Sequence, residues 1–148
     1  MRKTFVMFVL AAVGAFAVVG CGGGGGGSSS PPPAPPLVDV TGRWVGPYNS
    51  SVLGSQTATL VAQQIGASCT GTYSSSTGAL GTVSGSVSGD TLSFTITVTT
   101  PGCSGSFTGT GIVDDPPVGN LTMSFSYSGA SNAACGGPES GNGILTLQ

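Results

Sequence analysis

Apolar and polar residues alternate with a period of two along most of the chain after residue 37. The two clearest runs place apolar side chains at Leu92, Phe94, Ile96 and Val98, and at Leu121, Met123, Phe125 and Tyr127, with Ser or Thr between them. A period of two turns successive side chains to opposite faces of a β-strand. Because no segment of this region has the period of an amphipathic helix, the pattern predicts an all-β domain.

Glycine, proline, asparagine and aspartate interrupt the alternation and separate eight predicted strands. The strands are expected at residues 40–45, 56–63, 69–74, 81–88, 91–99, 105–113, 120–128 and 143–147. Gly89-Asp90 indicates a tight hairpin, and the other links are short enough to join antiparallel neighbours. We therefore expect an eight-stranded antiparallel up-and-down barrel. An open β-sandwich with Greek-key links is the alternative.

The predicted strand at residues 105–113 carries small residues on the face that bears Phe107. Gly105, Gly109 and Gly111 are in phase with that ring, so small residues would lie beside the large side chains of neighbouring strands. Narrow barrels fill their interior in this way. Closure would also remove edge strands, which an uncharged Ser/Thr surface does not protect from aggregation.

An up-and-down barrel of eight strands has two unlike ends. The links after the second, fourth and sixth strands share the end where the chain enters and leaves, and we expect them to be mostly tight. The links around residues 46–55 and 129–142 are longer and share the other end. We therefore expect a ligand or partner to meet the barrel at this loop end.

The N-terminus has the pattern of an export signal. A basic start, Met1-Arg2-Lys3, is followed by an apolar run at residues 5–19 and by a small residue before Cys21. These features resemble the signals of bacterial lipoproteins. The resemblance implies that residues 1–20 are a signal peptide and that Cys21 is acylated, which would anchor the chain to a membrane. A transmembrane anchor is the alternative, but the apolar run is short for one.

Residues 21–36 form the predicted tether, and residues 37–148 form the predicted β-barrel domain. Six glycines follow Cys21 and prolines dominate residues 31–36, so a flexible part leads into a stiffer polyproline II part. Gly22 stands where many enterobacterial lipoproteins of the inner membrane carry Asp. By resemblance to that sorting rule, we expect a lipid-anchored protein of the cell envelope, in the outer membrane if the host has two membranes.

Topology also predicts which cysteines pair. Cys103 and Cys135 follow the fifth and seventh strands, so both lie at the loop end, beside neighbouring strands. Cys69 begins the third strand at the opposite end. Exported chains form disulfides, and three cysteines besides Cys21 leave one unpaired. We predict a Cys103–Cys135 disulfide and an unpaired Cys69.

Charged residues make up only 5% of the chain. Arg43 is the only base after the predicted signal peptide. The acidic residues are Asp39, Asp90, Asp114, Asp115 and Glu139, which bring the net charge after residue 20 to about −4. Nucleic acid is excluded as a partner because phosphate binding needs clustered Lys or Arg.

The same composition argues against catalysis. The chain has no His, and no Lys follows residue 20, so a Ser or Cys nucleophile would lack its usual base. Asp114-Asp115 precedes two prolines as a polar turn would, and the cysteines lack zinc-type spacing. We therefore expect that the protein is not an enzyme and that it has no cofactor and no metal site. The alternative is a carbohydrate-active site that pairs Asp114 or Asp115 with Glu139, with carboxyl groups within about 10 Å.

Two short motifs resemble known eight-stranded barrels. Thr41-Gly42-Arg43-Trp44 is similar to the Gly-x-Trp opening of lipocalins and avidins. In lipocalins this Trp plugs the closed end, so the resemblance implies a core role for Trp44. The segment from Thr70 to Ser75 resembles the third strand of avidins, whose Tyr and second following Ser contact biotin. Tyr73 and Ser75 match those two residues.

The chain also departs from both families. Its last predicted strand lacks the Arg that lipocalins set across the Trp, Gly46 stands where avidins have Asn, and the later Trp residues of avidins are missing.

These patterns lead to two hypotheses for function. The first is a non-enzymatic, membrane-anchored barrel that binds a small apolar ligand at its loop end. The residues expected near that mouth are Tyr48, Asn49, Ser50, Tyr73, Ser75, Tyr127 and Asn132. The second is a structural or adhesion-type envelope lipoprotein with a filled barrel and no ligand. A cavity at the loop end distinguishes the two, and the sequence names no protein partner.

Overall fold

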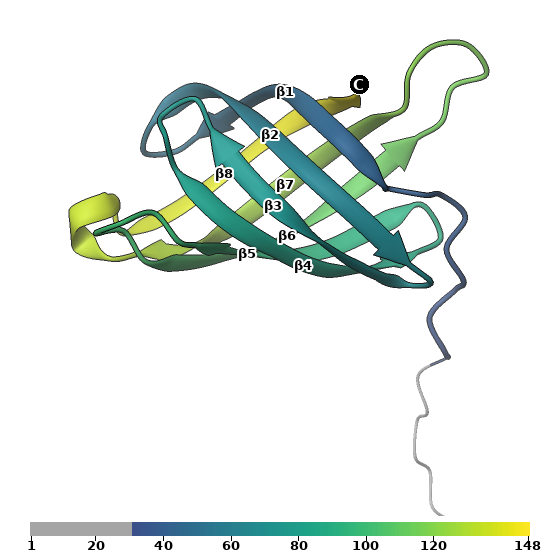
Figure 1. Cartoon of the computed structure of the whole chain (residues 1–148), viewed down its shortest axis with the longest axis horizontal. Helices are drawn as coiled ribbons and strands as arrows, with labels where there is room; N and C mark the ends of the chain where they lie inside the picture. Colours follow the sequence, from purple (N-terminus) through teal and green to yellow (C-terminus); the bar gives the residue numbers. More distant parts are fainter. Residues whose placement is uncertain (1–30) are drawn as a thin grey trace, which may run out of the picture. The chain divides into compact units, whose positions relative to one another are not determined.

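Eight β-strands close into a barrel in the computed structural model, which describes residues 31–148 (Figure 1). The strands are β1 (Gly42–Ser50), β2 (Gly54–Ile65), β3 (Ser68–Ser75), β4 (Leu80–Ser88), β5 (Thr91–Val98), β6 (Gly105–Asp114), β7 (Thr122–Ser131) and β8 (Pro138–Leu147). Each pairs antiparallel with the next, and β8 pairs back with β1. The predicted up-and-down barrel is confirmed, and the open sandwich is excluded.

The predicted signal peptide at residues 1–20, the lipidation site Cys21 and the tether up to residue 30 lie outside the described residues. Their assignments stay predictions from the sequence.

All eight predicted strands are present, but β1 and β8 are longer than the sequence pattern indicates. β1 continues to Ser50 and β8 begins at Pro138, so the links at the loop end are shorter than expected. The longest link, residues 115–121, lies at the other end, where tight links were expected. The other two links at that end, residues 66–67 and 89–90, are tight, so the expectation of mostly tight links holds. The third link is long because Pro116 and Pro117 lack the N–H that a strand ladder needs.

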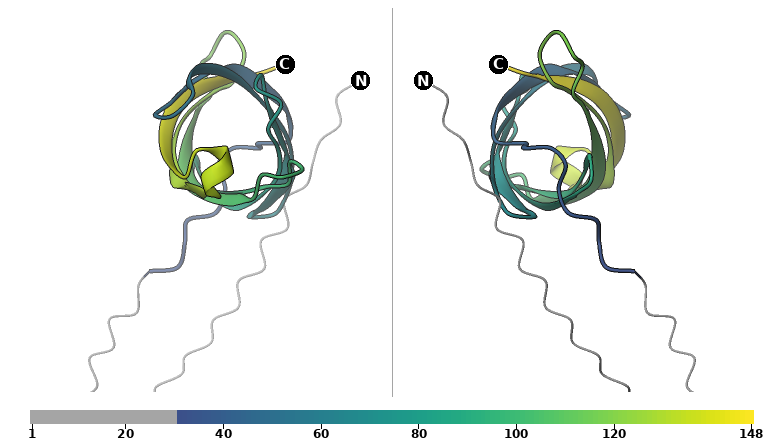
Figure 2. Two further views of the ribbon diagram at one scale, coloured as in Figure 1. Left: turned by 90° about the vertical axis from the view of Figure 1, so that its left-hand side faces the viewer. Right: turned by 90° about the vertical axis from the view of Figure 1, so that its right-hand side faces the viewer.

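Glycines on the inward face make room for aromatic rings on the adjacent strand. Phe94 pairs with Gly109, and Phe107 pairs with Gly129. A methyl group on Gly129 would lie 2.8 Å from Phe107 Cδ1, so each ring lies against the neighbouring strand. The large and small residues of the interior therefore alternate as predicted, inside a wall that forms a closed ring when viewed end-on (Figure 2).

One end of the barrel is filled by side chains. Trp44 is fully buried there, and its indole Nε1 donates a hydrogen bond of 2.9 Å to the carbonyl oxygen of Val40. The other large side chains that are fully buried are Val40, Cys69, Val87, Leu92 and Met123. A buried indole needs an acceptor for its N–H, so Trp44 plugs this closed end as the sequence predicted.

The chain reaches the barrel along the β4–β5 hairpin at the closed end. Leu37 N donates to the carbonyl oxygen of Gly89 at 2.8 Å, and Gly89 N donates to that of Pro35 at 3.1 Å. Gly89 has a φ of 61°, a backbone conformation that the predicted Gly89-Asp90 hairpin requires. Contacts with the barrel therefore begin within the proline-rich segment that the sequence assigned to the tether. The links after β1, β3, β5 and β7 lie at the opposite end of the barrel (Figure 1).

Residues 32–148 make one compact unit that contains all eight strands, the disulfide and the buried core. Every strand has a partner on both sides, so no ladder edge is left open within this unit. The unit therefore carries the contacts that it needs to fold by itself. In the part of the chain that the structure describes, no helix is long and apolar enough to cross a membrane.

Candidate ligand-binding site

A cavity of about 410 Å³ opens at the loop end of the barrel. Its aromatic lining comes from Tyr48, Tyr73, Phe107, Phe125 and Tyr127, and its aliphatic lining from Leu53, Ala58, Ala79, Ile96, Val98 and Ala134. A second, entirely apolar cavity of about 40 Å³ lies deeper and shares Ala58, Tyr73, Ile96 and Phe125 with the first. The barrel is therefore hollow at the loop end and filled at the closed end.

Tyr127 is the centre of the aromatic wall. Its ring lies 5.9 Å from Phe107 and 6.1 Å from Tyr48 in edge-on arrangements, and 6.3 Å from Phe125 in a stacked one. Such pairs add about 0.5–1.5 kcal/mol each beyond their buried area. β1, β6 and β7 therefore meet at one continuous aromatic surface that faces the cavity.

Two glycines of β8 keep this mouth open. Tyr48 pairs with Gly143, and Tyr127 pairs with Gly141. A methyl group on Gly141 would lie 2.6 Å from Tyr127 Cε1, and one on Gly143 would lie 2.6 Å from Tyr48 Cβ. Both tyrosines therefore rest against the β8 backbone, and their rings leave the centre of the barrel unfilled.

Two pairs of polar side chains in the cavity wall are hydrogen-bonded to each other. Tyr127 donates its hydroxyl hydrogen to Glu139 Oε1 at 2.6 Å, and Tyr73 donates to the Tyr48 hydroxyl oxygen at 3.1 Å. Burial raises the pKa of Tyr73 far above its ordinary value, and the Tyr48 hydroxyl raises it further. Burial also raises the pKa of Tyr127, and the neighbouring Glu139 carboxylate adds to this effect. Both phenols are therefore neutral donors at neutral pH.

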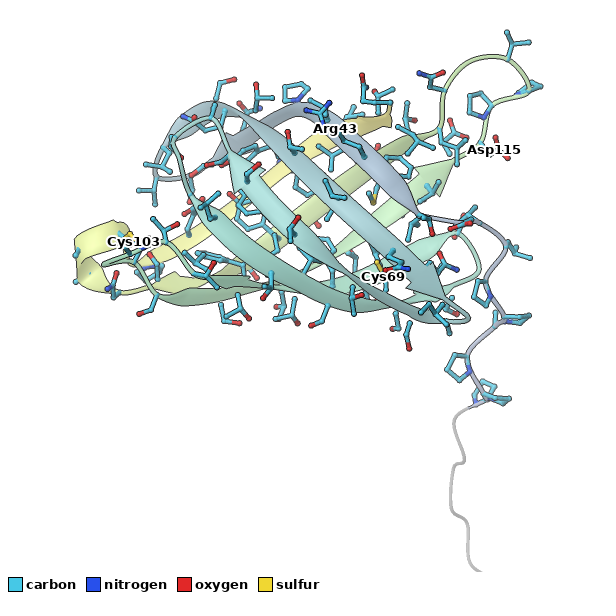
Figure 3. The ribbon with its side chains drawn as sticks, viewed as in Figure 1. Arg43, Cys69, Cys103 and Asp115 are labelled. Carbon is cyan, nitrogen blue, oxygen red and sulfur yellow. A yellow bond between two sulfur atoms is a disulfide. The ribbon has the colours of Figure 1, made fainter. Side chains whose placement is uncertain are left out.

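The structure separates the carboxylates that a carbohydrate-active site would need. Glu139 lies opposite Gly129 on β7, whereas Asp114 lies opposite Thr122. These two β7 residues are about 23 Å apart along the strand at about 3.3 Å per residue. Asp115 follows Asp114 at the closed end (Figure 3). A pair within about 10 Å cannot form between Glu139 and either aspartate.

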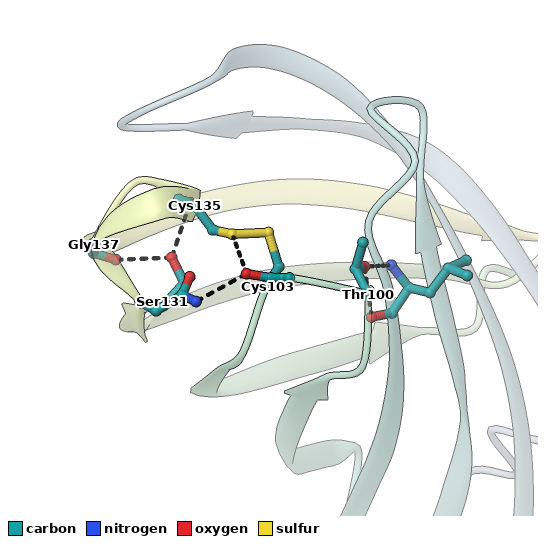
Figure 4. The surroundings of a disulfide bond; sticks show 8 residues. Thr100, Cys103, Ser131, Cys135 and Gly137 are labelled. Atoms are coloured by element: carbon teal, nitrogen blue, oxygen red, sulfur yellow. Dashed lines mark hydrogen bonds between the residues drawn. A yellow bond between two sulfur atoms is a disulfide. The ribbon is translucent and has the colours of Figure 1, made fainter.

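The predicted disulfide forms at the rim of the mouth. Cys103 and Cys135 are joined with their Cα atoms 5.7 Å apart, so the link after β5 is tied to the link after β7 (Figure 4). Asn132 Nδ2 donates to the carbonyl oxygen of Gly102 at 3.0 Å, and Ser131 Oγ donates to that of Cys135 at 2.9 Å. Both half-cystines line the cavity, so the bridge fixes part of its rim.

Within residues 31–148 Cys69 has no disulfide partner, as predicted, and its side chain is buried. It lies towards the closed end, far along the barrel from Cys103 (Figure 3).

Three of the seven predicted ligand residues line the cavity, namely Tyr48, Tyr73 and Tyr127. The other four are not among the residues that line it, and three of these have local hydrogen-bonding roles. Ser50 Oγ accepts hydrogen bonds from Val52 N and Leu53 N. Ser75 bonds Thr77 at 2.7 Å.

Asn132 holds the loop that contains Gly102. Asn49 is exposed on the outer face.

The sequence pattern did not single out Phe107, Phe125 or Glu139 as ligand contacts. The alternation placed both phenylalanines inside the barrel, but it did not indicate how far each side chain lies from the mouth along the barrel axis. Glu139 was missed because the first half of β8 carries Gly141 and Gly143 on its inward face, and these give no apolar alternation. Period-two glycines opposite aromatic strands are the signal that could have revealed it.

No protein-family model, curated protein or solved structure matches the chain.

Proposed function

We propose that the protein is a membrane-anchored lipoprotein whose barrel binds a small apolar ligand at its loop end, without catalysing a reaction. The observation that carries the proposal is the cavity of about 410 Å³ at the mouth. Ligand sites typically have about 300–1,000 Å³, a mostly apolar wall and a few polar groups that fix orientation. Here the rings around Tyr127 supply the wall, and the Tyr48, Tyr73 and Glu139 side chains supply the polar groups.

The shape of the interior favours an elongated ligand. The deeper cavity is lined by apolar residues such as Leu60, Val83 and Leu145, and it shares Ala58 and Ile96 with the cavity at the mouth. A ligand would insert an apolar tail towards this floor and keep its polar group at the rim. Burial of that tail supplies the driving force, at about 25 cal/mol per Å² of apolar surface.

A substitution at the floor tests binding. Ala58 is 3% exposed and lines both cavities, so Ala58→Phe should fill the space where a tail would lie. Thr57→Phe is the matched control, because it adds the same ring at an exposed, outward-facing neighbour. The probe is N-phenyl-1-naphthylamine, which fluoresces on entering an apolar site. We expect residues 32–148 and the Thr57→Phe variant to bind the probe. The Ala58→Phe variant should bind it at least about tenfold more weakly.

The absence of probe binding by the unsubstituted unit would contradict the proposal and favour a structural envelope component without a ligand. Equal affinities of the two phenylalanine variants, with wild-type thermal unfolding in both, would show that the probe binds elsewhere.

The anchor is the second part of the proposal and is supported by the signal pattern around Cys21. Acylation of Cys21 would anchor the chain to the membrane at a residue N-terminal to the barrel domain. The residues of the mouth would then not be needed for anchoring. Cells that express the full chain and are fed an alkyne-bearing fatty acid should label the wild-type protein. Cys21→Ser should abolish the label, whereas the control Cys69→Ser should keep it. Label that persists in Cys21→Ser would contradict the assignment.

A further inference from the structure

The described residues give the cavity one negative charge and no positive one. Among the lining residues from the described part of the chain, Glu139 is the only one with a charged side chain. Within residues 31–148 the only base is Arg43, which is exposed at the start of β1, towards the closed end (Figure 3). No cation of the described chain therefore neutralises the carboxylate at the mouth.

The carboxylate of Glu139 is held in place by one hydrogen bond, which occupies only part of its capacity to accept hydrogen bonds. Its Oε1 atom accepts the hydrogen bond from Tyr127 at 2.6 Å. No other hydrogen bond to this carboxylate occurs in the described part of the chain, although an ionised carboxylate can accept several. Glu139 is half-buried in the cavity wall. Its second oxygen is therefore available to a donor on a ligand.

Aromatic rings line the cavity near Glu139 as well, and such rings can attract a cation. Tyr127 stacks on Phe125 with ring centroids 6.3 Å apart, and Tyr48 lies 6.1 Å from Tyr127. The face of an aromatic ring attracts an ammonium group by about 0.5–2 kcal/mol, depending on how far water is excluded. A donor bonded to Glu139 would lie beside this aromatic surface.

We propose that the ligand of the mouth is an apolar molecule with a protonated amine, and that Glu139 binds the ammonium group. This inference rests on the proposed ligand-binding function and adds the chemical class. A fatty-acid carboxylate would instead bring a second negative charge to the half-buried Glu139, which is unfavourable. A neutral alcohol could donate one hydrogen bond but would gain no charge interaction.

Three amphiphiles with the same chain test the assignment. Decylamine, decanol and decanoate compete with N-phenyl-1-naphthylamine for residues 32–148 at neutral pH, each below the concentration at which it forms micelles. We expect decylamine to bind about tenfold more tightly than decanol, and decanoate to bind most weakly. The preference for the amine should shrink at high salt, because ions screen a partly exposed charge pair.

Glu139→Gln is the direct variant, because glutamine retains an acceptor for the Tyr127 hydroxyl but removes the charge. We expect the ratio of decylamine to decanol affinity to fall from about ten to about one. Asp114→Asn is the matched control: it removes one negative charge at the closed end and should leave the ratio unchanged.

The outcomes separate the two proposals. If decanoate binds as tightly as decylamine, or if Glu139→Gln keeps the amine preference, the ligand class is wrong although the cavity binds. If Asp114→Asn removes the preference as fully as Glu139→Gln does, net charge rather than Glu139 selects the amine, and the assignment fails. If neither the probe nor any amphiphile binds, the ligand-binding function itself fails.

Discussion

At the scale of single residues, the tyrosines of the mouth link stability to pH. Burial is the main reason why the pKa values of Tyr73 and Tyr127 exceed the ordinary value of 10.0. The folded protein therefore keeps both phenols neutral at pH values where the unfolded chain loses their protons. A group with a raised pKa in the folded state contributes its full stability below the unfolded pKa and loses it as the pH rises.

The free energy of unfolding should thus fall above about pH 10, by at most about 1.4 kcal/mol per pH unit for each tyrosine. Tyr127 should contribute less than this because it is half open to solvent in the cavity. Cys69 should add a decline that starts near pH 9, since burial raises the pKa of its thiol above 9.0. Urea unfolding between about pH 8 and about pH 11 measures the slope, which Tyr73→Phe should flatten. Identical slopes for the variant and the wild type would contradict this account.

At the scale of elements, the sequence predicted the strands whose inward residues are large and apolar. β5 and β7 were predicted from the alternation that begins at Leu92 and at Leu121, and the Cys103–Cys135 bridge was predicted from the order of the strands around the barrel. The first half of β8 was not recognised. Its inward glycines leave room for the side chains of Tyr48 and Tyr127, their pairing partners on the two neighbouring strands. Such pairing cannot be inferred from the sequence of one strand alone.

The disulfide joins two such elements and should stabilise the barrel strongly. Cys103 and Cys135 are 32 residues apart, and a loop of that length corresponds to about 3–4 kcal/mol in the chain-entropy model. We expect the double substitution of both cysteines by Ala to lower the urea-unfolding free energy by about this amount and to weaken probe binding, because the rim is no longer tied. Cys69→Ala is the control that keeps the bridge. A loss below about 1 kcal/mol in the double variant would show that the links are held by their hydrogen bonds instead.

At the scale of the whole molecule, the division into a filled end and a hollow end organises the function. Trp44 and its neighbours close the end that the chain approaches through Pro35 and Leu37. The cavity opens at the other end, beside Glu139. The sequence predicted the barrel and both ends, because alternation and link lengths fix the topology. It could not predict whether the interior was empty, which depends on how each ring lies against the opposite glycines.

The central claim is that the hollow end holds a ligand, and native mass spectrometry tests it most directly. Residues 32–148, purified from the native host or incubated with its lipid extract, should carry one small molecule per chain. The Ala58→Phe variant, treated in the same way, should lose this adduct. A clean mass of the unliganded chain under both conditions, with the disulfide intact, would contradict the account and identify the barrel as a structural component.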